Sequence, residues 1–247
     1  MNNFLKLGER IDDLQIKGLK IIQNPEGFCF GMDAVLLSSF AKIKKGSKVA
    51  DLGCGNGIIS ILLSGKTQAG SITGVEIQEK VAEMAQRSVE MNHICDRVKI
   101  INTDLKQVSE LLGLSSMDVV VTNPPYRTKD CGMENPDDAK AISRHEILCT
   151  LEDVIEASKK LLKPGGKLFM VHRPDRLVDL ICLLRNYSLE PKRLRFVHPR
   201  QEAAPNMILI EALRGGGKYI KVDKPLYIYE EGNKYSREVL EIYNSPI

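Results

Sequence analysis

Short segments rich in β-branched residues alternate with segments of helical periodicity from Ser47 onward, and this alternation constrains the fold more than any other feature. A βαβα order predicts a parallel sheet with helices on both faces. The predicted strands are Lys48–Asp51, Ser71–Glu76, Val98–Asn102, Met117–Thr122, Lys167–His172, Pro191–His198 and Met207–Leu213. The predicted helices are Ile58–Lys66, Gln78–Asn92, Leu105–Leu112, Leu148–Leu162 and Pro174–Asn186.

The last two predicted strands are joined by a short link that contains the seven-residue loop Pro199–Pro205. Parallel neighbours need a long crossover connection, so we expect these two strands to pair as an antiparallel hairpin. The result is an α/β sheet of seven strands with an antiparallel seventh strand. We treat the chain as one domain, with an N-terminal cap segment (1–46), a core (47–214) and a turn-rich C-terminal tail (215–247).

The composition excludes several classes of protein. No apolar run approaches the roughly 18 residues of a membrane span, and the first ten residues lack the apolar stretch of a secretion signal. We therefore expect a cytoplasmic protein that does not contact a membrane. The six cysteines and four histidines follow neither a disulfide framework nor zinc-ligand spacing, so we expect reduced thiols and no metal site.

The segment Val49–Gly57 reads VADLGCGNG, an apolar strand that runs into an acidic residue and a glycine-rich turn. Glycines let a ligand approach the backbone closely. A dinucleotide fingerprint would read GxGxxG, whereas the spacing here is GxGxG, and Asp51 places a carboxylate where a diphosphate would lie. Repulsion disfavours a nucleotide diphosphate, and the acidic group instead suits a ligand with a free amino acid end.

Two further acidic residues follow predicted strands. Glu76 ends the second strand, 21 positions after Gly55, a spacing that suits a grip on a ribose diol. Asp104 follows the third strand and could accept a hydrogen bond from an adenine amine. For both residues a simple helix-capping role stays open.

The most informative motif is Asn123-Pro124-Pro125-Tyr126, which directly follows the strand Met117–Thr122. Two prolines stiffen the backbone and donate no hydrogen bond, so the carbonyl oxygens are fixed at the end of the strand. An Asn oxygen and a proline carbonyl suit an NH₂ group, and Tyr126 offers a face for stacking. The alternative is a rigid turn with an aromatic plug.

On these motifs the chain resembles the class I S-adenosylmethionine-dependent methyltransferases, and among them the amino-group methyltransferases with an (Asn/Asp)-Pro-Pro-(Tyr/Phe/Trp) motif. The resemblance covers Phe28–Leu213 and implies the Rossmann-like seven-stranded methyltransferase sheet with S-adenosylmethionine as the cofactor. The catalytic residues that it implies are Asn123, Pro124, Pro125 and Tyr126. The cofactor-binding residues that it implies are Phe30, Asp33, Asp51, Gly53, Gly55, Asn56, Gly57, Glu76, Ile77, Asp104, Leu105 and Asn123.

A narrower resemblance is to the bacterial tRNA adenine-N6 methyltransferases that modify adenine 37 of a valine tRNA. It rests on Glu9–Leu14, Ile21–Gln23, Asp33–Leu37, Arg144–Glu146 and the basic hairpin with Pro199-Arg200. It implies a tRNA substrate. Methylation of a protein glutamine amide or of guanine N2 in ribosomal RNA stays open, as does a non-catalytic RNA-binding role on the same fold. We expect a monomer.

Basic residues are unevenly distributed. The net charge is only +3, from 35 basic and 32 acidic residues, but residues 192–221 hold seven basic and two acidic ones. A solvated charged face is the alternative to RNA binding. His145 is either a substrate contact or an ordinary helix histidine. The candidate phosphate-binding residues are Arg127, Lys129, Arg144, Lys192, Arg193, Arg195 and Arg200.

Overall fold

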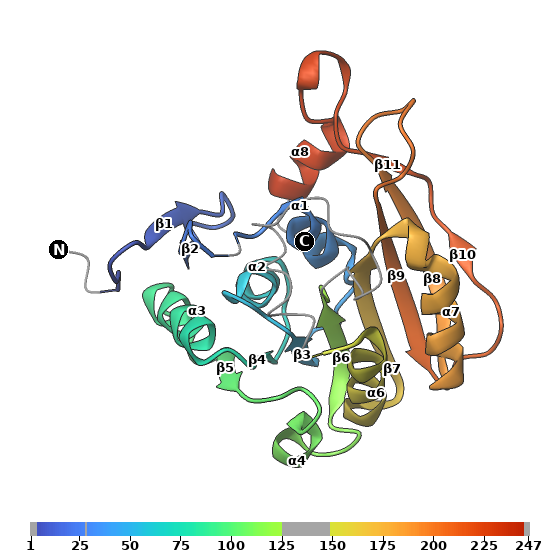
Figure 1. The fold of residues 1–247 in the computed structure, drawn as a ribbon, viewed down its shortest axis with the longest axis horizontal. Coiled ribbons are helices and arrows are strands. Elements are labelled where there is room, and N and C mark those ends of the chain that lie inside the picture. Colours follow the sequence, from blue (N-terminus) through green and yellow to red (C-terminus); the bar gives the residue numbers. More distant parts are fainter. Residues whose placement is uncertain (1–3, 28, 125–148, 245–247) are drawn as a thin grey trace.

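The computed structural model describes residues 4–27, 29–124 and 149–244. A nine-stranded sheet forms the centre, with helices on both faces (Figure 1). The seven strands predicted from the sequence are present, several with longer bounds, as β3 (Lys48–Leu52), β4 (Ser71–Glu76), β5 (Val98–Asn102), β6 (Met117–Thr122), β7 (Leu162–His172), β8 (Leu189–His198) and β9 (Met207–Arg214). The described helices are α1 (Met32–Phe40), α2 (Ile58–Lys66), α3 (Glu79–Met91), α4 (Val108–Leu112), α6 (Leu151–Leu161), α7 (Leu177–Asn186) and α8 (Arg237–Asn244).

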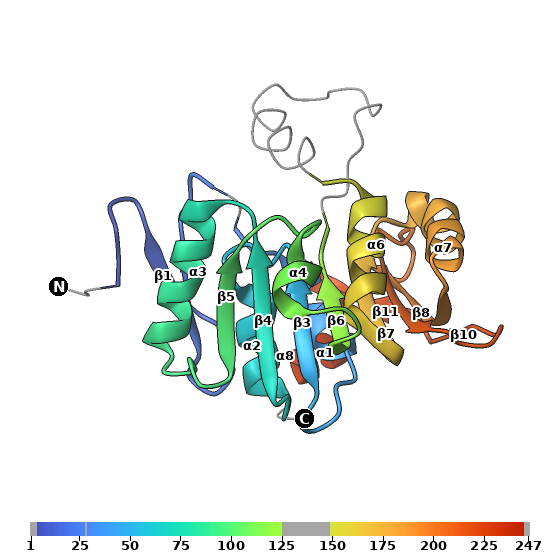
Figure 2. The same ribbon diagram turned by 90° about the horizontal axis from the view of Figure 1, so that it is seen from below.

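The sheet order across the predicted strands is β8-β9-β7-β6-β3-β4-β5. All pairs from β7 through β5 are parallel, whereas β9 runs antiparallel to both β7 and β8. The prediction of a mixed α/β sheet with an antiparallel seventh strand is therefore confirmed. Figure 2 shows the parallel strands side by side between their flanking helices.

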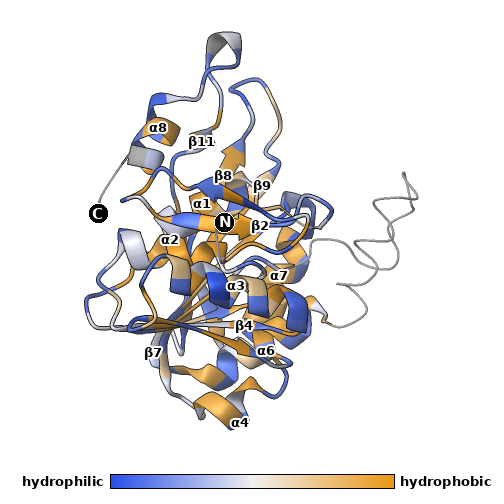
Figure 3. Cartoon of the chain, turned by 90° about the vertical axis from the view of Figure 1, so that its left-hand side faces the viewer, coloured by the Kyte–Doolittle hydropathy of each residue, from blue (hydrophilic) through white to orange (hydrophobic). Residues whose placement is uncertain are grey.

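Alternating residues of the strands feed two separate hydrophobic clusters, as the two-residue period of a strand requires. Val49 and Val121 pack with α1, α2 and α3 on one face. Ala50 and Val120 pack with α4, α6 and α7 on the other. The central strands are coloured as hydrophobic in Figure 3, which agrees with burial on both faces.

Several predicted boundaries differ from the structure. The helix predicted at Leu105 begins only at Val108, because Asp104 accepts the Lys106 N–H at 2.9 Å and holds a turn. The segment from Pro174 begins as a 3₁₀ turn, Pro174–Arg176, before α7. The helix predicted from Leu148 begins at Leu151 among the described residues, where Thr150 and Asp153 form a capping box.

The N-terminal cap segment holds a hairpin of β1 (Arg10–Asp13) and β2 (Lys20–Gln23). Polar side chains of α3 attach it to the core: the Ile22 N–H donates to Ser88 Oγ at 3.0 Å, and the Lys20 N–H donates to Asn92 Oδ1 at 2.8 Å. The hairpin therefore continues the layer of helices on the α1 and α2 face.

The C-terminal tail, for which the sequence indicated only turns, adds to the sheet. Its short strands β10 (Lys221–Val222) and β11 (Leu226–Tyr227) both pair in parallel with β8. After a second 3₁₀ turn, Glu231–Asn233, helix α8 packs beside α1 (Figure 1). The Tyr243 hydroxyl donates to Met32 Sδ at 3.6 Å, so the tail contacts the start of α1.

Arg193 of β8 joins three parts of the fold. Its side chain is only 14% exposed, and its Nε donates to Glu211 Oε2 of β9 at 2.9 Å. Its Nη2 donates to the Phe40 carbonyl at the end of α1, and Nη1 lies 3.4 Å from Asp223 Oδ2 in the tail. The guanidinium also lies 3.7 Å from the centre of the Phe40 ring.

We expect Arg193→Ala to lower the free energy of unfolding by about 3 kcal/mol, because it leaves buried acceptors without their partner. Urea denaturation measures the change. Arg185→Ala is the matched control, since that arginine is half-exposed with a single ion pair, and it should cost less than about 1 kcal/mol. Equal losses in the two variants would contradict a structural role for Arg193.

Candidate functional site

A cavity of about 920 Å³ opens at the carboxyl ends of β3, β4, β5 and β6. This edge is where open α/β sheets bind ligands. The sequence-predicted residues that line it are Asp33, Gly53, Gly55, Asn56, Glu76, Ile77, Asp104, Leu105, Asn123 and Pro124. Phe30, Asp51 and Gly57 do not line it. Parallel pairing thus gathers most of the predicted site residues that the structure describes.

The glycine loop after β3 needs its glycines for backbone conformation. Gly53 and Gly55 have φ angles of 69° and 54°, in the left-handed region that side-chain-bearing residues rarely adopt. The N–H groups of Gly53 and Cys54 donate to the Val75 carbonyl at 2.9 and 3.0 Å, which attaches the loop to β4. Gly57 has a φ angle of 84°, and a side chain there would also press on Ala85 of α3, 3.3 Å away.

Glu76, at the end of β4, is held by two backbone donors. Its Oε2 accepts the Gly55 N–H at 3.0 Å, and its Oε1 accepts the Gln78 N–H at 2.9 Å. The side chain is almost buried, at 5% exposure, yet it lines the cavity. Each carboxylate oxygen has two lone pairs, so the pair of oxygens can still receive two hydroxyl groups.

Asp51 lies beneath the loop rather than on the cavity wall. Its Oδ2 accepts hydrogen bonds from the Ser60 N–H at 3.0 Å and the Ser60 hydroxyl at 2.7 Å, which join β3 to α2. Within the part of the chain that the structure describes, Oδ1 has no hydrogen-bond partner. Burial raises the pKa of Asp51 to about 7, against the lowering effect of the Ser60 hydrogen bonds.

Asn56 is directed toward the N-terminal hairpin. Its Nδ2 donates to Gln23 Oε1 at 3.3 Å, and the same oxygen accepts the Phe30 N–H at 3.0 Å. Gln23 therefore joins the cap segment to the glycine loop. The sequence analysis missed this role of Gln23, because no local pattern reports a side chain that bonds across 33 positions.

Asn123 and Pro124 follow β6 and line the cavity. Nδ2 of Asn123 donates to Asp33 Oδ2 of α1 at 2.8 Å. The preceding residue is fixed as well, because the Thr122 hydroxyl donates to the Leu52 carbonyl of β3 at 2.9 Å. Pro125, Tyr126, Arg127, Lys129, Arg144 and His145 lie outside the described residues.

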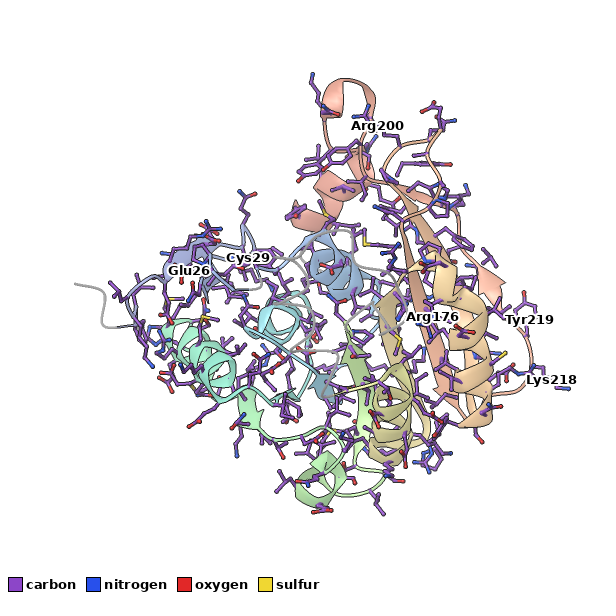
Figure 4. The ribbon with its side chains drawn as sticks, viewed as in Figure 1. Glu26, Cys29, Arg176, Arg200, Lys218 and Tyr219 are labelled. Atoms are coloured by element: carbon purple, nitrogen blue, oxygen red, sulfur yellow. The ribbon has the colours of Figure 1, made fainter. Side chains whose placement is uncertain are left out.

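The predicted phosphate-binding residues of β8 and its following loop lie away from the cavity. Lys192 donates to the Gly217 and Tyr219 carbonyls at 2.9 and 2.8 Å, and Arg195 pairs with Glu238 at 2.7 Å. Arg200 donates to Asn233, and Figure 4 shows it beside the tail. Together with Arg193, these residues attach the tail to β8, so tail contacts explain much of the basic cluster.

Arg173, which the sequence analysis did not single out, lines the cavity. It also lines a neighbouring hollow of about 500 Å³ with Pro174, Asp175, Pro205 and Asn206. Its position directly after β7, at the same sheet edge, was the available signal. The described ranges contain no cluster of three His, Cys, Asp or Glu side chains that could hold a metal ion. No helix in them is both long and apolar enough to span a membrane.

Comparison with known proteins places these features in context. The sequence model of the methyltransferase small domain matches residues 30–181, more than half of the chain. The tRNA1(Val) (adenine(37)-N6)-methyltransferase of Parabacteroides distasonis is 29% identical over 181 residues, covering 73% of this chain and 75% of that protein. The enzyme of the same name from Porphyromonas gingivalis is 29% identical over 206 residues, covering 81% and 80%.

Solved structures support the fold. A predicted O-methyltransferase from Agrobacterium tumefaciens superimposes with a TM-score of 0.70 at 23% identity, covering 86% of this chain and 96% of that one. A geranyl diphosphate methyltransferase in complex with SAM gives a TM-score of 0.55 at 14% identity, covering 74% and 84%. At these identities the likeness concerns the fold alone.

The raised pKa of Asp51 predicts a pH-dependent stability. The folded state retains a proton that the unfolded state loses near pH 4, so rising pH destabilises the protein between about pH 4 and pH 7. We expect the stability of Asp51→Asn relative to the original chain to rise by about 3 kcal/mol between pH 5 and pH 8. Urea denaturation at both pH values measures it.

Ile59→Val is the control, because it removes one buried methyl group and no titratable group, so its effect on stability should be the same at both pH values. A constant difference between Asp51→Asn and the original chain at the two pH values would refute the buried, protonated carboxyl.

Proposed function

The chain belongs to the methyltransferase small domain family, and we propose that it transfers a methyl group from S-adenosylmethionine to N6 of an adenine in a tRNA anticodon loop. The observation that carries the proposal is that Asn123 and Pro124 line the same cavity as Glu76 and Asp104. The curated relatives are named for adenine 37 of tRNA1(Val), and we propose the same nucleotide here. We further propose that the protein acts as a cytoplasmic monomer without a metal.

The residues around the cavity fit the cofactor. Glu76 would receive the two ribose hydroxyls, Asp104 the adenine amine, and residues 53–56 of the glycine loop would border the methionine part. Oδ1 of Asp51 lies beneath that loop without a hydrogen-bond partner among the described residues, and the ammonium group of a bound cofactor would favour the ionised form of this carboxyl. When bound, the cofactor supplies a methyl group on a sulfonium, which is already a strong electrophile.

The protein's main task is then to align the adenine amine with that methyl group. The lone pair of the amine is delocalised into the ring, so the amine is a poor nucleophile. Asn123 Oδ1 and the Pro124 carbonyl would accept hydrogen bonds from its two N–H groups, which turns the lone pair toward the methyl group. As nitrogen becomes positive, both acceptors bind more strongly, which stabilises the transition state. The methylated nitrogen is acidic, so water can take the proton.

Aromatic and basic side chains would hold the RNA at the site. Tyr126 would stack on the splayed-out base and contribute roughly 1–3 kcal/mol. Arg127, Lys129 and Arg144 keep their proposed phosphate contacts. Arg173 joins them because it lines the cavity. We do not include Arg193, whose side chain is occupied inside the fold.

We expect labelled cofactor to transfer methyl groups to tRNA, and nucleoside analysis to identify N6-methyladenosine. Total tRNA, ribosomal RNA, DNA and cell protein are tested in parallel. Label in ribosomal RNA or protein would overturn the tRNA substrate and favour the guanine or glutamine alternative. No transfer to any acceptor would contradict a methyltransferase activity.

We also expect Asn123→Ala to lower kcat by about 100-fold or more while leaving cofactor affinity nearly unchanged, because it removes one transition-state acceptor. Arg185→Ala, on α7 and not among the residues that line the cavity, is the control and should retain full activity. Retained activity in Asn123→Ala would remove this side chain from the mechanism.

A further inference from the structure

We propose that Asp33 is a positioning residue that sets which way the amide of Asn123 faces. The inference rests on the proposed function, because it assumes that Asn123 Oδ1 accepts a hydrogen bond from the substrate amine. The sequence resemblance assigned Asp33 only to cofactor binding. The structure instead shows a direct hydrogen bond, 2.8 Å long, from Asn123 Nδ2 to Asp33 Oδ2.

The carboxylate of Asp33 is itself held in place. Its Oδ1 accepts the Ala34 N–H at 2.9 Å in the first turn of α1, so Oδ2 is turned toward Asn123. The start of a helix favours a negative charge. Gly31 leaves the space that this arrangement needs, because a Cβ there would lie 2.9 Å from Asp33 Oδ1.

Both partners sit on anchored backbone. The Thr122 hydroxyl bonds to Leu52, which fixes the strand end before Asn123. Helix α1 packs its Phe40 ring edge-on against Phe169 of β7, and Tyr243 of the tail contacts Met32 beside Asp33. The distance between Asp33 and Asn123 is therefore set by the packing of α1 on the sheet.

The chemistry of the two groups determines which atom of the Asn123 amide faces Asp33. A carboxylate only accepts hydrogen bonds, so the amide atom that faces it must be Nδ2. The amide oxygen then points to the other side of the group, as an acceptor for an amine. The terminal torsion of an Asn side chain has two main orientations, and the hydrogen bond to Asp33 favours one of them. In the wrong one, an NH₂ group would face the NH₂ group of the substrate.

A reciprocal exchange tests this directly. Asn123→Asp alone places two acceptors face to face, and we expect kcat to fall about 100-fold. The double variant D33N/N123D restores a donor opposite an acceptor, because the amide introduced on α1 now donates to the carboxylate at position 123. Its kcat should be at least about tenfold higher than that of Asn123→Asp alone. Asp33→Asn alone keeps an oxygen that can accept from Asn123, so its kcat should fall least.

Cofactor affinity, measured by titration, separates positioning from cofactor binding. We expect it to stay within about threefold of the original chain in all three variants. A double variant no more active than Asn123→Asp, or a loss confined to cofactor affinity, would overturn the positioning role.

A measurement on the protein alone, without RNA, tests the hydrogen bond between Asp33 and Asn123 independently of the proposed function. In the nitrogen–proton spectrum of the protein, the Asn123 side-chain amide signal, identified by its loss in Asn123→Asp, should shift in Asp33→Ala. If Asp33→Ala fails to fold, Gly31→Ala displaces the carboxylate instead and should shift the same signal. An unchanged signal would overturn the pair. A shifted signal in a protein that methylates no RNA would keep the pair and refute the proposed function.

Discussion

The parallel pairing of β3, β4, β5 and β6 is the constraint on which the site depends. Parallel strands end at the same edge of a sheet, so the residues that follow them meet although they are distant in the chain. The register places Leu52 beside both Val75 and Thr122. A slip of one residue would turn the side chains of a strand to the opposite face and exchange its contributions to the two hydrophobic clusters. The same packing that stabilises the sheet therefore also sets the spacing within the cavity.

Much of this could be predicted from the sequence because the signals are local. The strand period, the short link between the last two predicted strands and the glycine spacing are all contained in short windows. Glu76 and Asn123 could be assigned to the cavity because they lie at the ends of buried strands. The rule that ligands bind at the carboxyl edge then needs only the correct strand order.

The remaining features depend on contacts between distant segments. A basic residue such as Arg193 has the same sequence signature whether it faces solvent or bonds to Glu211 and Phe40. For this reason the sequence alone does not distinguish a basic surface that binds RNA from basic residues that bond within the fold. The sequence also did not predict the hydrogen bonds from Asn56 to Gln23 and from Asn123 to Asp33. These bonds depend on how the cap segment and α1 pack against the rest of the fold. The tail strands are only two residues long, too short for any periodicity.

The pairing of the tail with β8 has a consequence for self-association. The ten-residue β8 would otherwise be an edge strand of the sheet, and an exposed edge strand can pair with strands of other molecules. β10 and β11 occupy two stretches of this edge. Arg195 bonds to the Lys224 carbonyl between them, and Lys192 bonds to the Tyr219 carbonyl just before β10. The basic residues of β8 thus help keep the molecule from aggregating through its own sheet.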